Sequence, residues 1–398
     1  MSKKITIGTS IVLMLLAVVV TFQITYIALN NKYKNELNQV IQSEETFSKL
    51  AAVDSLYRSL YVGEIDEEQL MDTIIRGYVY GTGDKYAYYL DKEQFAELTA
   101  DTNATMQGIG VYVIYNDDAI EIISVMPDSP ALEAGLEPGD LIVYVDGESV
   151  AELGYNTAVS RLKGEAGTLA KFTVLRGEEV IEYSIKRGYV NEQTVMSHVY
   201  EVDPTIGIIK ILSFDYGTPG QLKEAVSTLT ESGITKLIFD VRYNPGGELE
   251  SIVEILDYLL PEGPIVRIVD ADGTEEVRTS EASQLDMPMC VLVNGNTASA
   301  AELFSSALQD YDKATLVGTT TYGKGTVQTI IQLADHTGIG LSTSMYYPPY
   351  SDNFEGVGVQ PDVVIEMDES LAEKNIYKIT DEEDTQLQKA VEILTTAE

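Results

Sequence analysis

Apolar positions change their spacing along the chain, and the changes divide it into regions. Within residues 32–100 the segment "EETFSKLAAVDSLYRSLYV" has apolar residues every three or four positions, the repeat of an amphipathic helix. The next run, "DEEQLMDTIIRGYVYG", has acidic residues in its first turn and ends in glycine, as helices often do. We expect a helical region over residues 32–100, whose apolar stripe packs on its own domain or, alternatively, forms a homodimer contact.

Residues 101–188 have the pattern of short strands. "GIGVYVIY" and "AIEIISVM" are strand-like runs, and "EPGDLIVYVDGESV" indicates a turn, a strand and a second turn. "TLAKFTVLRGEEVIEYSIKR" predicts a hairpin around Arg176-Gly177. This segment is therefore expected to be a small strand-rich domain of its own.

Residues 189–366 alternate apolar strands with helical patterns. Strands are expected in "TIGIIKIL", "TKLIFDVR" and "MCVLVNG", and helices in "TPGQLKEAVSTLTESG" and "ELESIVEILDYLL". Continuous apolar strands between helices are typical of an α/β layer with a mostly buried sheet. Residues 367–398 predict a last helical segment, for which Thr380 and Glu383 have the spacing of a capping box.

The N-terminus carries an uncharged apolar stretch. No charge occurs from Ile5 to Asn31, and "IVLMLLAVVV" lies in its middle. About 20 apolar residues span a bilayer as a helix, so residues 1–31 are expected to form a cytoplasmic tip and a transmembrane anchor. A cleaved signal peptide is the alternative, but no convincing small-x-small cleavage site is found. Lysines flank the stretch on both sides. The short tip ahead of a large acidic domain favours an extracytoplasmic position for the rest of the chain.

Composition narrows the classes of function. The net charge of −37, from 26 Lys and Arg against 63 Asp and Glu, argues against a nucleic-acid partner, which needs a basic face. The single cysteine, Cys290, excludes an intrachain disulfide framework, and its apolar surroundings predict a buried structural thiol. Two histidines and no clustered ligands suggest neither a metal nor another cofactor.

Ser299 follows an apolar strand and begins a helical pattern, in "NGNTASAAELFSSAL". Ser299 and Glu302 have the S-x-x-E spacing of a capping box, so a simple helix cap is one interpretation. The start of a helix also favours negative charge, which suits a serine alkoxide or an oxyanion equally well. This window alone leaves cap and nucleophile both open.

Two other stretches hold candidate partners for a nucleophilic serine. In "DVRYNPGGELE", Gly246 and Gly247 offer backbone N–H groups able to hold an oxyanion, although a tight turn explains them too. Lys324 lies between two glycines in "TYGKGTVQ", which is odd unless the backbone bends or is closely approached there. To act as a base Lys324 must be neutral, which requires burial in an apolar site. Gln328 follows on the same face of the expected strand.

The histidines are alternative bases. His336 lies in the polar turn "LADHTG", and His198 lies in "MSHVYEVD", remote in sequence from both junctions. A surface position is the simpler interpretation of each.

Four motifs occur together along the chain, "DVRYNPGG", "NGNTASAAELFSSALQD", "GTTTYGKGTVQ" and "GVGVQPDVVI". This set closely resembles the carboxy-terminal processing peptidases, the tail-specific serine proteases. "GIGVYV" and "SPALEAGLEPGDLIVYVDGESV" resemble the PDZ domain that those enzymes carry. The resemblance implies a crotonase-like protease core of mixed sheet with helices over residues 189–366, with a PDZ domain inserted over residues 101–188.

The resemblance also implies roles for individual residues. The family's nucleophile matches Ser299, its general-base lysine matches Lys324, and the glutamine that orients this lysine matches Gln328. Its oxyanion donors match the backbone N–H groups of Ala300 and of Gly246 or Gly247. The PDZ loop that receives a chain-terminal carboxylate matches Gln107, Gly108, Ile109 and Gly110.

These roles imply a membrane-anchored serine endopeptidase that cleaves protein substrates near their C-termini without a metal or cofactor. Its PDZ domain would bind free, apolar C-termini and gate the active site. Two rival functions stay open. One is an inactive PDZ-containing scaffold that binds peptides, against which the intact Ser299, Lys324 and Gln328 argue. The other is a serine hydrolase of the same fold that uses His336.

Overall fold

A computed structural model of the chain describes residues 47–100, 105–281, 284–371 and 374–396. The chain divides into two units, Met1–Thr73 and Ile74–Glu398. The anchor expected over residues 1–31 lies outside the described residues, and no helix among those described is long and apolar enough to cross a bilayer. In the first unit residues 47–60 are helical. Helix α2 (Glu67–Gly81) follows, and the division falls within it.

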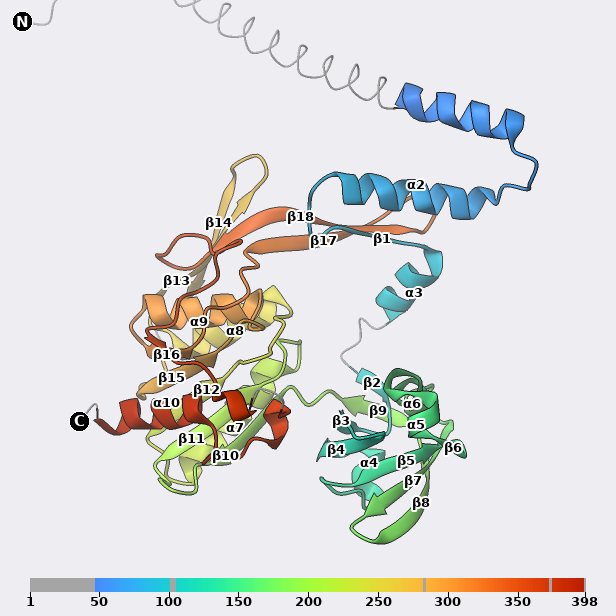
Figure 1. Ribbon diagram of the computed structural model, residues 1–398. Coiled ribbons are helices and arrows are strands. Elements are labelled where there is room, and N and C mark those ends of the chain that lie inside the picture. The colour runs from blue at the N-terminus through green and yellow to red at the C-terminus, as the bar shows by residue number, and fades with distance from the viewer. Residues whose placement is uncertain (1–46, 101–104, 282–283, 372–373, 397–398) are drawn as a thin grey trace, which may run out of the picture. The chain divides into compact units, whose positions relative to one another are not determined.

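One six-stranded sheet of the second unit has helices packed on both of its faces (Figure 1). Its neighbouring strands run parallel except for the first pair, β10 and β11. This confirms the mixed sheet of an α/β protease core. The strand order is β10 (Val195–Val199), β11 (Ile206–Ile211), β12 (Lys236–Asp240), β15 (Met289–Val293), β16 (Ala314–Gly318) and β19 (Val363–Val364).

Successive residues of this sheet enter two different cores. Leu237 and Phe239 of β12 belong to the core formed with three helices, whereas Ile238 belongs to the core formed with α10 (Thr385–Thr396). Because a strand turns successive side chains to opposite faces and both faces are covered, these strands are apolar throughout. The three helices are α7 (Thr218–Glu231), α8 (Leu249–Leu259) and α9 (Ala300–Asp310).

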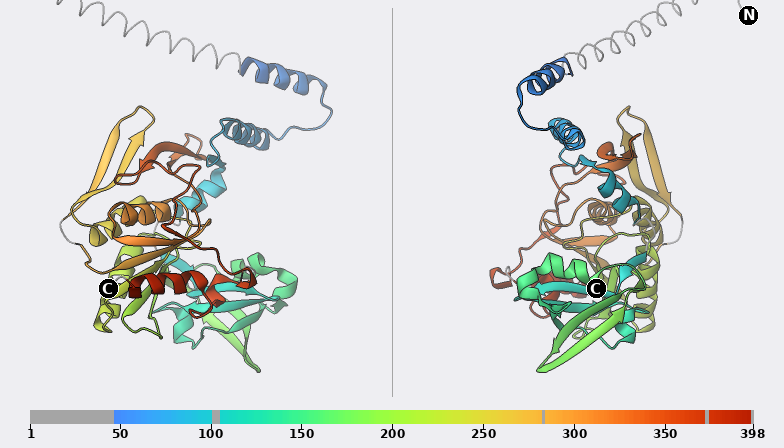
Figure 2. Two further views of the ribbon diagram at one scale, coloured as in Figure 1. Left: turned by 60° about the vertical axis from the view of Figure 1, so that its left-hand side comes forward. Right: turned by 90° about the vertical axis from the view of Figure 1, so that its right-hand side faces the viewer.

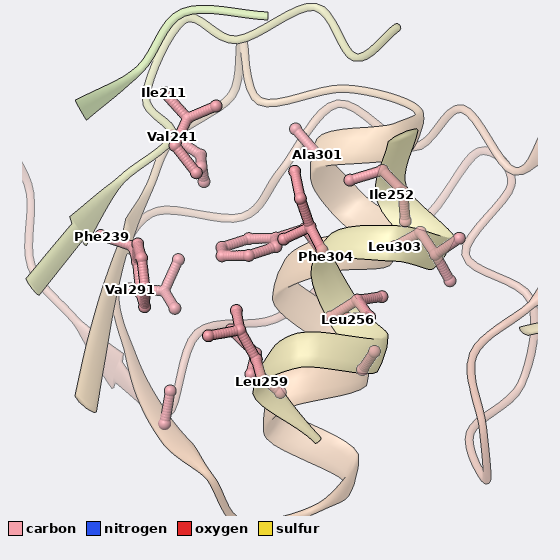
Figure 3. Close-up of a cluster of buried hydrophobic side chains, with 14 of the residues drawn as sticks. Ile211, Phe239, Val241, Ile252, Leu256, Leu259, Val291, Ala301, Leu303 and Phe304 are labelled. Atoms are coloured by element: carbon pink, nitrogen blue, oxygen red, sulfur yellow. The ribbon is translucent and has the colours of Figure 1, made fainter. Parts of the chain in front are cut away.

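Phe304 fixes α9 to the sheet (Figure 3). Its ring centre lies 5.4 Å from that of Phe239 in a nearly perpendicular arrangement and 5.6 Å from that of Phe214. Every residue of α9 from Ala300 to Leu308 is buried, so the helix has no solvent-facing side over that length. The N-terminus of α9, and Ser299 just before it, are therefore held by the core.

A second sheet is built from strands far apart in sequence. β18 (Gly338–Tyr347) pairs with β13 (Gly263–Asp270), which pairs with β14 (Glu275–Ser280) in a hairpin that stands out in both views of Figure 2. β17 (Thr326–Gln332) and β1 (Tyr88–Leu90) also pair with β18. The segment just before β1 is thereby brought to the protease core. Helix α3 (Lys92–Ala100) follows β1.

Residues 105–191 form a compact strand-rich domain. Ile120, Ile122 and Ile142 are fully buried in its own hydrophobic core. β2 (Thr105–Gly108) pairs with β9 (Gly188–Asn191), so the chain enters and leaves at one place, as an inserted domain requires. The remaining elements are β3 (Val111–Asn116), β4 (Ala119–Val125), α4 (Pro130–Glu133), β5 (Leu141–Val145), β6 (Glu148–Ser149), α5 (Val150–Leu153), α6 (Tyr155–Leu162), β7 (Leu169–Arg176) and β8 (Glu179–Lys186).

The last helix begins later than its capping-box pattern suggests. Thr380 and Glu383 are hydrogen-bonded to each other, but α10 starts at Thr385. Asp384 accepts from the backbone N–H groups of Gln386 and Leu387, so Asp384 caps this helix and the assignment to Thr380 is wrong. Two short 3₁₀ turns, Glu369–Leu371 and Ile376–Lys378, precede it.

Candidate active site

Ser299 occupies a strained position between β15 and α9. Its φ of 56° and ψ of −121° lie where side chains other than glycine are rarely found, and such strain often marks functional sites. Its side chain makes no capping hydrogen bond, whereas the Glu302 carboxylate accepts from the Ser299 N–H at 2.9 Å. Ser299 and Glu302 thus face each other as the expected capping box requires, the Glu302 side chain holds the turn, and Ser299 Oγ remains available to another partner.

Tyr346 is the hydrogen-bond partner of that oxygen. Its hydroxyl lies 3.1 Å from Ser299 Oγ and donates to the Lys324 carbonyl oxygen at 2.7 Å. The side chain is buried at the end of β18, and burial raises the pKa of the phenol, which therefore stays protonated. Its sequence context, "GIGLSTSMYY", is that of an ordinary strand, so the sequence alone did not indicate its place beside Ser299.

The two glycines of "NPGG" differ in what their N–H groups contact. The N–H of Gly246 donates to Asn244 Oδ1 at 2.8 Å. Neither the N–H of Gly247 nor that of Ala300 has an acceptor within the described part of the chain. Of the two glycines left open by the sequence, Gly247 is therefore the one with a donor available for an oxyanion.

Glycine is required at both positions by close packing. A Cβ on Gly246, at φ 106°, would lie 2.8 Å from Ser299 Cβ, and one on Gly247 would lie 2.4 Å from the Phe214 carbonyl oxygen. Asn244 holds the loop against Ser299, because its carbonyl oxygen accepts from the Ala298 N–H at 2.9 Å. The loop therefore packs closely against the turn that contains Ser299.

Lys324 lies in the loop between β16 and β17 rather than in a strand. Its Nζ is 5.1 Å from the centre of the Tyr86 ring, and it makes no hydrogen bond to Ser299 Oγ in the structure as described. Burial lowers the pKa of Lys324, and the nearby Glu355 carboxylate acts in the opposite sense. The Lys324 side chain is thus partly buried, and this partial burial favours its neutral form.

A cavity of about 420 Å³ brings the candidate residues together. Ser299, Lys324 and Gln328 line it along with Gly247 and Ala300. Apolar side chains form much of its remaining wall. The other lining residues are Pro245, Glu248, Leu249, Leu303, Thr326, Val327 and Tyr346.

Gln328 reaches this cavity because β17 is irregular. The pairing of β17 with β18 shifts register between Val327 and Gln328, which interrupts the alternation of faces that the sequence pattern assumed. Both residues consequently line the cavity. The Gln328 amide donates to Thr326 Oγ1 at 3.2 Å, and no contact with Lys324 is present among the described hydrogen bonds.

Glu302 is a buried carboxylate that joins the Ser299 turn to the Lys324 loop. It accepts from the N–H groups of Ser299 and Lys324 at 2.9 and 2.8 Å, and also from the Gly323 N–H and the Thr321 hydroxyl. Burial raises the pKa of Glu302, while these four donors lower it. The sequence indicated a helix cap here, and nothing local could reveal the contacts to residues 321–324.

Neither histidine lines the cavity that contains Ser299 and Lys324. His198 is exposed and pairs with Asp381 at 2.8 Å. His336 lies in the turn that joins β17 to β18, with φ 71°. The seven residues of β17 extend about 20 Å, so this turn is far from the cavity at the other end of the strand. No group of metal-binding side chains occurs among residues 47–396 as far as these are described.

The loop expected to hold a chain-terminal carboxylate lies between β2 and β3. Gln107 Oε1 accepts from the Ala166 N–H at 2.8 Å, and Gly110 has φ 85°. The N–H groups of Ile109 and Gly110 have no acceptor in the described residues. β3 pairs with β4 on one side only, so its other edge is open in this domain.

Comparisons with protein families match three segments of the chain. The model of "Peptidase family S41" matches residues 205–365, and that of a "PDZ domain" matches residues 107–186. The model of the "Activating protease CtpB N-terminal domain" matches residues 8–94. The order of segments therefore agrees with a protease core that carries a PDZ domain.

Individual relatives agree with this result. The chain is 34% identical over 327 residues to the carboxy-terminal processing protease CtpA of Bacillus subtilis, covering 81% of this chain and 70% of CtpA. It is 30% identical over 335 residues to the carboxy-terminal-processing protease of Bartonella bacilliformis, covering 81% and 76%. A candidate S41 protease of Bacteroides fragilis shares the fold, with a TM-score of 0.52, 19% identity and coverage of 85% and 99%. The chain is therefore a serine protease of peptidase family S41 and belongs to the carboxy-terminal processing proteases.

Proposed function

We propose that the protein is a membrane-anchored endopeptidase in which Ser299 is the nucleophile and Lys324 the general base. The observation that supports this proposal is the shared cavity, which is lined by Ser299, Lys324, Gly247 and Ala300, the last two with N–H groups that have no acceptor among the described residues. The strained backbone of Ser299 and the lowered pKa of Lys324 support it further.

The reaction is acyl transfer in two halves. Neutral Lys324 takes the proton of Ser299 as Oγ attacks the scissile carbonyl, and the N–H groups of Gly247 and Ala300 donate to the resulting oxyanion. The lysine then passes its proton to the leaving amine as the C–N bond breaks. Water, deprotonated by the same lysine, then attacks the acyl-enzyme. The ester C–O bond breaks, and the lysine returns the proton to Ser299 Oγ.

Catalysis requires a movement of the lysine side chain. Lys324 Nζ lies over the Tyr86 ring, and must come within hydrogen-bond distance of Ser299 Oγ to take its proton. Gln328 lines the same cavity, and its amide oxygen could accept from the lysine and orient it. Leu249, Leu303 and Val327 favour an apolar substrate side chain beside the scissile bond.

The PDZ domain is proposed to bind the substrate C-terminus and gate the protease. The unpaired N–H groups of Ile109 and Gly110 suit a terminal carboxylate, and the open edge of β3 suits a peptide added as a further strand. Free, apolar C-termini are therefore the expected ligands.

Residues 1–31 are proposed to anchor the chain in the cell membrane, with the protease outside the cytoplasm. The helix of residues 47–60 has exposed apolar side chains, among them Leu56 at 60% and Leu60 at 71%, which support homodimerisation through this region.

Product mapping tests the proposed reaction. The full chain in detergent is incubated with an unfolded protein that ends in apolar residues, and the fragments are identified by mass spectrometry. We expect internal cleavage near the C-terminus and covalent labelling of Ser299 by a fluorophosphonate probe. Stepwise removal of single residues, or labelling at another serine, would contradict the proposal.

A change at Gly110 is expected to impair recognition of the substrate tail. A Cβ at this position would lie 2.3 Å from Ser129 Cβ, and its φ of 85° disfavours other residues, so Gly110→Val displaces the loop. We expect binding of a C-terminal peptide, measured by fluorescence anisotropy, to weaken about tenfold or more. The preference for a free over an amidated C-terminus should also fall.

Gly177→Ala is the matched control, because it has φ 60° with open space around it in the β7–β8 turn. Labelling of Ser299 by the probe should stay intact in both variants. An unchanged preference of the Gly110→Val protein for free C-termini would contradict the assigned loop.

A further inference from the structure

Glu355 contacts the loop that carries the proposed base. One carboxylate oxygen accepts from the Gly325 N–H at 2.8 Å, immediately after Lys324. The other receives a 2.8 Å ion pair from Lys85 Nζ and a 3.4 Å hydrogen bond from the Tyr86 hydroxyl. Glu355 stabilises a positive charge on Lys324 and so opposes the effect of burial.

Lys85 reaches this place because β1 pairs with β18 and brings the preceding residues to the site. Its Nζ is 4.8 Å from the centre of the Tyr86 ring, the same ring that lies 5.1 Å from Lys324 Nζ. The two amino groups are therefore at most about 10 Å apart. This is about one screening length at physiological salt and Lys85 is 55% exposed, so their mutual repulsion is weak and adds only to the effect of the Glu355 pair.

We propose that Lys85 is a positioning residue for the reaction: by pairing with Glu355 and by its own charge, it favours the uncharged form of Lys324 that accepts the serine proton. The proposal rests on the assignment of Lys324 as the base. Lys85 touches none of the reacting atoms and acts on them only through Glu355 and Lys324.

Other groups lie near Lys324. Among the described residues Glu355 is the carboxylate whose charge acts on the Lys324 amino group, and Glu248 lines the same cavity. Glu302 faces the backbone of Lys324 and is engaged by four donors. Burial raises the pKa of the Tyr86 and Tyr346 hydroxyls, so both stay uncharged at neutral pH. The groups concerned are Tyr86 before β1, Ser299 and Glu302 at the start of α9, Tyr322 in the same loop, Tyr346 in β18, and Glu355 after β18.

The sign of each effect follows from Coulomb's law. In Lys85→Met the charge of Glu355 is no longer neutralised, so the pKa of Lys324 rises and activity is lost on the acidic side. In Glu355→Gln the attraction for a charged Lys324 disappears, so its pKa falls, while the amide oxygen can still accept from the Gly325 N–H. The two changes thus move the same limb of the pH profile in opposite directions.

The experiment measures fluorophosphonate labelling of Ser299 and peptide kcat/KM between pH 5 and 10, using the full chain. We expect the ascending limb to move up by about half to one pH unit in Lys85→Met and down by a similar amount in Glu355→Gln. At a pH below the ascending limb, the rate should therefore fall about three- to tenfold in Lys85→Met and rise by a similar factor in Glu355→Gln. Both shifts should shrink in 1 M salt, because the Lys85 side chain is 55% exposed.

Lys223 provides a matched control. It forms a 2.7 Å ion pair with Glu254 and lies 5.9 Å from the centre of the Tyr258 ring, away from the cavity. Lys223→Met should leave the profile unchanged, and Lys85→Gln should reproduce the effect of Lys85→Met. The proposal would be overturned if the ascending limb of the pH profile did not move in Lys85→Met and Glu355→Gln, or if it moved in the same direction in both. Retained activity in Lys324→Ala would instead overturn the proposed base, so the two failures are distinguishable.

Discussion

Ser299→Ala and Lys324→Ala are each expected to lower kcat/KM for cleavage of an unfolded protein by about 10³-fold or more. The first change removes the proposed nucleophilic oxygen, and the second removes the proposed base that takes its proton. Both residues line the same cavity, and alanine at either position leaves the core untouched. The measurement is the rate of fragment formation under conditions where the wild-type enzyme is not saturated.

His336→Ala is the decisive comparison for the base. This residue lies in the β17–β18 turn, about 20 Å along the strand from the cavity, so its variant should cleave at the wild-type rate. Robust cleavage by Lys324→Ala together with loss in His336→Ala would assign the chemistry to the histidine. A protein that cleaves nothing in the wild-type form would support the scaffold alternative.

Glu302→Ala is expected to have the largest effect on stability. It removes a fully buried carboxylate and leaves the N–H groups of Ser299, Gly323 and Lys324, which are buried or partly buried, without their acceptor. Each unsatisfied buried donor costs about 1–3 kcal/mol, partly recovered if water enters, so we expect the free energy of unfolding to fall by about 3 kcal/mol or more. The chain has no tryptophan, so urea unfolding is followed by tyrosine fluorescence and by loss of Ser299 labelling.

Activity in Glu302→Ala should fall beyond what unfolding explains, because Ser299 and Lys324 lose the side chain that ties them together. Glu254→Ala is the control, since this glutamate is 58% exposed and pairs only on the surface. Wild-type stability and rate in Glu302→Ala would show that the buried contacts to residues 321–324 are dispensable.

The alternation of apolar strands and helices predicted the α/β core, because both faces of the central sheet are covered. The helical spacing after Ser299 also predicted that this serine precedes a helix, and the sequence motif showed that Lys324 lies between two glycines. The glycine pair illustrates the limit of that approach. Only the contact of the Gly246 N–H with Asn244 favours Gly247 as the oxyanion donor.

The residues that the sequence did not indicate act over long separations along the chain. Tyr346 lies 47 positions from Ser299, and Glu355 lies 269 positions from Tyr86. Neither belongs to a local pattern that distinguishes it from an ordinary strand or loop residue. The error at Thr380 has a related cause, because Asp384 is fixed both by the start of α10 and by Arg242, which lies in the turn after β12.

Cys290 is the only thiol of the whole chain, and it is fully buried in the core beneath α10. Burial raises its pKa to about 12, so it remains a neutral thiol that reacts poorly with alkylating reagents. A cysteine placed on the open edge of β3 and another beside the catalytic cavity could therefore take up a pair of fluorophores without background labelling. Energy transfer between such dyes would follow the PDZ domain and the protease in real time as a substrate tail binds.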